Sequence, residues 1–210
     1  MGSDRAWLVP LTGVLGVVLL IVGFAVQGEP PSLGDEPARK IVDHYVDNKD
    51  AVLIGAALQG VAVTALVFFF AHMSRLIRVA EGDSGMLSRV AFGGGLIFAA
   101  GGAFDATLTF AMAEAAEDVR PESIVTLLAL FENDFIPLAV GLQLFLLGVG
   151  LAAWRSGFLP KWLAAITLLM AIIAVTPIGF VSFLAMALWV PITAILLAVR
   201  LRREGGPARA

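Results

Sequence analysis

One carboxyl group, that of Asp105, stands inside a long apolar stretch of the sequence that runs between Arg89 and Glu114. A charge without a partner is costly in the hydrocarbon core of a bilayer. Ionisable groups placed there therefore tend to handle protons or ions, or to hydrogen-bond inside a helix bundle. Because we expect no Lys or Arg at the depth of Asp105, we predict that this carboxyl group is protonated or shares a bound proton or cation.

Three polar side chains in other apolar stretches are predicted to lie at the level of Asp105. They are Gln59, Gln143 and Thr167, and each stands about nine residues from the expected outer end of its stretch, which is about 13–14 Å along a helix. The spacing predicts a polar cluster near the bilayer midplane. Two other interpretations stay open: a neutral Asp105 hydrogen-bonded to Gln59 or Gln143 that only holds helices together, and a polar lining for a small-molecule pocket.

The segment FENDFIP interrupts another apolar stretch with Glu132, Asn133 and Asp134. As one straight helix, the 34 residues from 121 to 154 would be about 50 Å long, which exceeds a hydrocarbon core of about 30 Å. We therefore expect the three polar residues to mark the outer boundary and to border an entrance above Asp105. Asn133 or Asp134 would cap the helix in which Pro137 occupies the first turn. The alternative is one long helix that is kinked at Pro137.

The sequence offers little for catalysis or for metal binding. It has no Cys and only two His, His44 and His72, which are expected on opposite sides of a membrane. A catalytic site needs a convincing nucleophile and base, and an intramembrane zinc site needs several ligands at one depth. The GDSG segment at 82–85 is a cytoplasmic turn rather than part of a protease. We predict no catalytic residue and no metal site, assign no cofactor, and lean against an enzyme.

The elements that must position these residues are transmembrane helices. Hydrophobic residues make up 59% of the 210 residues and charged residues 15%, far from the composition of a soluble domain. The fold class predicted is all-α: a polytopic membrane protein forming one domain, with a bundle of six transmembrane helices and short outer amphipathic helices. The spans are expected at about 6–26, 51–72, 89–113, 135–154, 162–176 and 181–199, and the outer helices at about 37–48 and 121–131.

The basic residues predict the orientation of the spans. Ten of the 14 Lys and Arg residues fall in the segments on one side of the expected membrane, together with both termini. The positive-inside rule makes that side cytoplasmic. We expect a multi-pass protein of a bacterial plasma membrane with both termini in the cytoplasm. With a net charge of −3, no nucleic-acid partner is predicted.

The stretch from Leu142 to Leu169 contains RSGFLPKW, a short turn that follows a Gly-rich helix. It resembles a pattern in bacterial multi-pass membrane proteins of a domain of unknown function, in which the turn has the form RSG-x-LP-x-W. The resemblance covers about the last third of the chain. It implies a membrane location, and no activity is assigned to that family.

Two functions are predicted from these residues. The first is a transporter-like or proton/cation-handling protein that uses Asp105, with a small molecule or cation as ligand and the lipid bilayer as surroundings. The alternative is a structural, sensory or accessory membrane subunit without transport or catalysis, in which the polar cluster only fixes the packing of helices. The sequence also allows a homo-oligomer.

Overall fold

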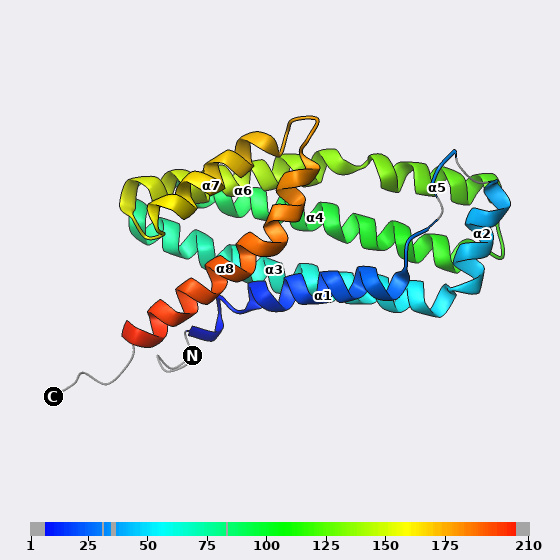
Figure 1. Cartoon of the computed structure of the whole chain (residues 1–210), viewed down its shortest axis with the longest axis horizontal. Helices are drawn as coiled ribbons and strands as arrows, with labels where there is room; N and C mark the ends of the chain where they lie inside the picture. The colour runs from blue at the N-terminus through cyan, green and yellow to red at the C-terminus, as the bar shows by residue number, and fades with distance from the viewer. Residues whose placement is uncertain (1–6, 31, 35–36, 83, 205–210) are drawn as a thin grey trace.

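The computed structural model describes residues 7–30, 32–34, 37–82 and 84–204, and these residues form helices joined by short loops without any strand. Figure 1 shows the helices arranged as one elongated bundle. Their bounds are α1 Thr12–Gln27, α2 Ala38–Asp47, α3 Lys49–Glu81, α4 Met86–Ala115, α5 Pro121–Asn133, α6 Phe135–Ser156, α7 Lys161–Ile173 and α8 Phe180–Glu204.

Four helical segments are long and apolar enough to cross a membrane. They are α3, α4, the segment Pro121–Ser156 that joins α5 to α6, and Phe180–Arg203 of α8. The chain is therefore a multi-pass membrane protein by length and composition. α1 with 16 residues and α7 with 13 are apolar but shorter. The prediction of six spans also counts these two helices, and for them it stays a prediction.

The interruption at FENDFIP is a single residue. α5 ends at Asn133 and α6 begins at Phe135, while Asp134 between them has φ −88° and ψ 20°. Pro137 lies in the first turn of α6, where backbone N–H groups have no partner within the helix and a missing N–H costs nothing. Figure 1 shows α5 and α6 running nearly in line. Both predicted arrangements are thus partly present: there are two helices, but they follow one another end to end.

α4 and α6 pack antiparallel at very short range because glycines face each other. A Cβ on Gly141 would lie 2.3 Å from the backbone N of Phe98, and one on Gly94 would lie 2.4 Å from the backbone N of Phe145. Small residues let two membrane helices approach until their backbones touch. Further along the same pair, Gly101 faces Leu138. Residues closer to the C-terminal end of α4 therefore lie beside residues closer to the N-terminal end of α6.

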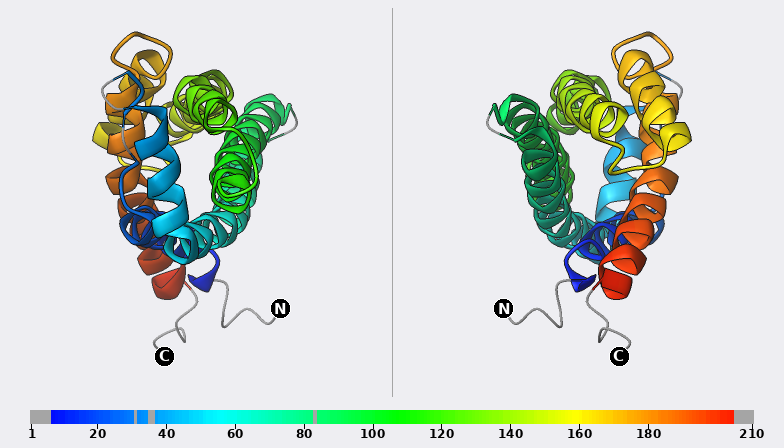
Figure 2. Two further views of the ribbon diagram at one scale, coloured as in Figure 1. Left: turned by 90° about the vertical axis from the view of Figure 1, so that its right-hand side faces the viewer. Right: turned by 90° about the vertical axis from the view of Figure 1, so that its left-hand side faces the viewer.

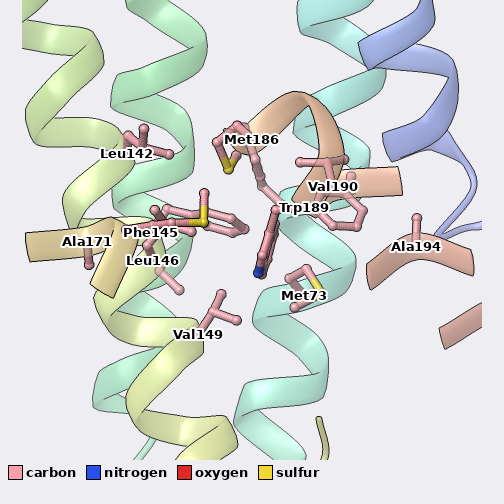
Figure 3. Close-up of a cluster of buried hydrophobic side chains, with 14 of the residues drawn as sticks. Met73, Leu142, Phe145, Leu146, Val149, Ala171, Met186, Trp189, Val190 and Ala194 are labelled. Carbon is pink, nitrogen blue, oxygen red and sulfur yellow. The ribbon is translucent and has the colours of Figure 1, made fainter. Parts of the chain in front are cut away.

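The remaining helices close a ring around the core. α1, α3, α4, α6 and α7 are neighbours in that order, and α8 packs between α7 and α1. Buried aromatic and aliphatic side chains fill the ring, and Figure 3 shows Trp189 of α8 pointing among Phe145, Met186 and Met73. Figure 2 shows α2 lying across one end of the bundle. There α2 and α5 form a second small core around Ile41, Tyr45 and Leu128.

The glycine contact between α4 and α6 can be tested with one added methyl group. Gly141→Ala forces a Cβ into the backbone of α4 and should lower the free energy of unfolding by about 1–3 kcal/mol. Gly93→Ala is the matched control, because nothing lies within 4 Å of a Cβ at that position. Thermal unfolding of the purified protein in detergent measures both. Equal stability of the two variants would contradict the contact.

Candidate functional site

Asp105 of α4 and Asp134, the residue between α5 and α6, lie against each other. Their carboxyl groups are close enough to share a hydrogen bond. The glycine contact explains this, because Asp105 stands one turn beyond Gly101 on α4 and Asp134 one turn before Leu138 on α6. The register that pairs Gly101 with Leu138 therefore pairs the two acids. The sequence assigned Asp134 to an entrance above Asp105, and the structure puts it in direct contact.

Each acid keeps one carboxyl oxygen without a hydrogen-bond partner. Oδ1 of Asp105 and Oδ2 of Asp134 are buried and unpaired among the described residues. Buried polar atoms in proteins are almost always hydrogen-bonded, so one such oxygen on each of two interacting acids needs an explanation. Carboxylate oxygens only accept hydrogen bonds, and therefore a proton, a donor or a cation satisfies both of them.

Asp105 also lines an apolar cavity of about 350 Å³ inside the ring of helices. Its walls come from α1, α3, α4, α6 and α8, and Asp105 is the only ionisable residue among them. Two of the lining side chains, Ile21 and Leu184, are more than half exposed on the outer surface of the helices. The cavity thus extends from Asp105 to exposed apolar side chains at the surface of the bundle.

The other two residues of the predicted entrance point outward. Glu132 and Asn133 are exposed, and the Asn133 side chain donates a hydrogen bond to the carbonyl of Ala129 at 2.8 Å. Glu132 is close enough to act on Tyr45 of α2. Burial, with the nearby Glu132 carboxylate, raises the pKa of Tyr45 to about 12. Tyr45 is therefore a neutral phenol at physiological pH, and it packs α2 into the second small core with α5.

Gln59 does not pair with Asp105. Its amide Nε2 donates a hydrogen bond to Oε1 of Gln27, at the end of α1, over 2.9 Å, and both side chains are buried. Gly23 and Gly55 make this possible, because their backbones lie so close that a Cβ on Gly55 would be 2.7 Å from the carbonyl oxygen of Gly23. The sequence reasoning missed Gln27. It stands at the end of an apolar stretch, and no periodicity indicates which way it faces.

Thr167 forms a third, separate contact. Its hydroxyl accepts a hydrogen bond from the indole N–H of Trp189 at 2.8 Å and donates one to the carbonyl of Leu163 at 2.7 Å. A buried indole N–H usually has such a partner. The pair fixes α8 against α7, and the Ser182 hydroxyl adds a bond from α8 to the carbonyl of Met170 on α7 at 2.9 Å.

The polar residues predicted at one level thus divide into separate contacts. Asp105 pairs with Asp134, Gln59 pairs with Gln27, and Thr167 pairs with Trp189. Gln143 is half-buried, with no side-chain hydrogen bond to the part of the chain that the structure describes. A search of the described residues finds no group of three or more His, Cys, Asp or Glu side chains that could hold a metal ion. Of these three contacts between described residues, the acid pair alone contains ionisable groups.

The Gln27–Gln59 pair should behave as a unit. Gln27→Leu and Gln59→Leu each leave one buried amide without its partner, and each should lower the free energy of unfolding. Because the double variant removes both polar groups, its loss should be smaller than the sum, with a coupling of about 0.6–1.7 kcal/mol. Gln143→Leu is the control and should be close to neutral. Additive losses in a thermal-unfolding cycle would show that the two amides do not interact.

Comparison of the chain with protein-family models, with curated proteins and with solved structures finds no match. Its function is therefore inferred from the residues themselves.

Proposed function

We propose that this multi-pass membrane protein binds and releases a proton or a small cation at the Asp105–Asp134 pair. The observation that carries the proposal is the contact between two carboxyl groups, each with a buried oxygen that lacks a partner. Two ionised carboxylates repel each other, and they share a hydrogen bond only when one of them carries a proton. A cation between them removes the same repulsion, so the pair is a site for one positive charge.

The position of the pair suits exchange with the outer side of the membrane. Asp105 lies sixteen residues beyond Arg89, about 24 Å along α4, and Asp134 lies twenty-one residues from Arg155, about 31 Å along α6. If these arginines mark the cytoplasmic boundary, a core of about 30 Å ends close to Asp134. The pair would then lie in the outer part of the bilayer, nearer to outside water than the midplane site that the sequence predicts.

The two acids have different surroundings, which gives them different roles in this proposal. Asp134 interrupts the helices beside the exposed Glu132 and Asn133 and is the contact to water. Asp105 faces the apolar cavity and is the contact to whatever enters from the lipid-facing edge. A charge that arrives at Asp134 can pass to Asp105 across their shared hydrogen bond. This arrangement suits a transporter-like protein in which the transfer of a proton or cation accompanies the movement of a molecule through the cavity.

Infrared spectroscopy of the reconstituted protein tests the site directly. A protonated carboxyl group absorbs apart from a carboxylate. We expect a protonated band that titrates with pH, that is lost in Asp105→Asn and that is shifted in Asp134→Asn, because the second variant removes the partner but leaves the buried Asp105 carboxyl group. Asp118→Asn, an exposed outer acid, is the control and should leave the band unchanged.

A flux measurement decides between exchange and a purely structural pair. Vesicles that contain the protein and a pH-sensitive dye should lose an imposed pH gradient faster than empty vesicles, and Asp105→Asn should abolish the difference. Repeating the assay in Na⁺ and K⁺ salts identifies whether a cation replaces the proton. A gradient that decays at the same rate with the parent protein and with Asp105→Asn would overturn the proposal, even if the infrared band is present.

A further inference from the structure

A second cavity, larger than the one beside Asp105, lies at the other end of the molecule. It is a groove of about 620 Å³ between α3 and α8, closed at its side by Phe158 of the α6–α7 loop and by Val9. The groove runs along α3 from Phe68 to Ala80, a separation of twelve residues or about 18 Å. Neither the Asp105–Asp134 pair nor its cavity takes part in it.

The walls of the groove are apolar and open to the surroundings of the bundle. Phe68 and Val79 are 60% and 79% exposed, whereas Leu197 of α8 forms a buried floor. Phe68, Leu76 and Leu197 are apolar side chains against which a fatty acyl chain can pack. An exposed apolar surface of this kind on a membrane-spanning helix faces the bilayer.

Among the described residues, the side chains that line this groove include positive charges and no negative ones. Arg75 of α3 and Arg200 of α8 line it, and none of its lining residues is acidic. The guanidinium of Arg200 donates to the carbonyl of Phe158 at 3.2 Å, which fixes its position at the mouth of the groove. His72 stands one turn deeper than Arg75, and its Nε2 is buried without a hydrogen-bond partner among the described residues. Arg75, Arg200 and His72 all line this one apolar groove.

We propose that this groove binds one anionic phospholipid of the cytoplasmic leaflet. The phosphate would lie against Arg75 and Arg200, since guanidinium groups bind phosphate through paired N–H donors. His72 would supply a further hydrogen bond at the glycerol level, and one acyl chain would occupy the groove toward Phe68. The cytoplasmic leaflet carries the anionic lipids that basic residues at the end of a span attract. The charge and the apolar length of the groove match both halves of such a molecule.

The occupant that this assignment must exclude is free phosphate, which shares the same arginine chemistry. Inorganic phosphate uses the two guanidinium groups but leaves the apolar length of the groove unfilled. A lipid with a neutral, zwitterionic headgroup fills the groove but gains less from the two arginines. The two features can be changed separately: Arg75→Gln removes charge, and Ala71→Phe fills the groove without changing charge, because Ala71 lines it.

The experiment measures lipid binding to the full chain after delipidation in detergent. Phosphatidylglycerol, phosphatidylcholine and inorganic phosphate are titrated separately, and retention is followed by native mass spectrometry with thermal unfolding as a second readout. Phosphatidylglycerol should bind about tenfold more tightly than phosphatidylcholine, and Arg75→Gln should remove most of that preference. Ala71→Phe should weaken both lipids several-fold.

Matched controls keep the result specific. Arg120→Gln removes an exposed arginine at the outer side, and Ala57→Phe adds a ring on an exposed face of α3 away from the groove. Both should bind phosphatidylglycerol like the parent. Equal affinity for the two lipids, unchanged binding by Ala71→Phe, or stabilisation by inorganic phosphate equal to that by phosphatidylglycerol would each overturn the assignment.

Discussion

The close, glycine-mediated packing of α4 against α6 is the contact on which the candidate site depends. Gly94 and Gly141 allow the two backbones to touch, and a Cβ at either position would meet backbone nitrogen at less than 2.5 Å. Contact at this distance fixes the antiparallel register, since neither helix can slide by a turn without driving larger side chains into backbone. This register then determines which residues meet where α4 lies beside the start of α6. There it brings Asp105 against Asp134, two groups separated by 29 positions in the chain.

The two ends of the bundle present opposite chemistry. One end carries the acid pair, the exposed Glu132 and a cap made by α2 and α5, while the opposite end carries Arg75 and Arg200 over an apolar groove. Between them, Trp189 and its aromatic neighbours fill the ring and tie α8 to α7. The cavity beside Asp105 reaches into this packing, since Val17, Leu66 and Met186 of the core line it. The acid pair and the groove lined by Arg75 and Arg200 thus lie on different parts of the bundle.

Much of the architecture follows from the spacing of the apolar residues and from the polar and Pro residues that interrupt it. The helix of α2 is predicted by Ile41 and Tyr45 at helical spacing, and both are buried against α5. The interruption near Asp134 follows from three polar residues before Pro137. The pairing of the polar groups did not follow, because counting along a helix gives depth but not direction. Gln59 meets Gln27 and Thr167 meets Trp189 through helix rotations that only tertiary contacts determine. The depth of Asp105 in the membrane, counted from the expected ends of the spans, stays a prediction.

The most direct test of this account is a cross-link between the two acids, and the chain has no native cysteine to interfere. The double variant Asp105→Cys/Asp134→Cys, oxidised in membranes, should form an intramolecular disulfide rapidly. A disulfide needs Cα atoms within about 7 Å of each other, and the register of α4 against α6 brings these two positions together. Asp105→Cys combined with Leu138→Cys, one turn out of register, should react slowly. Faster cross-linking of the offset pair, or none in either variant, would contradict the register and with it the proposed site.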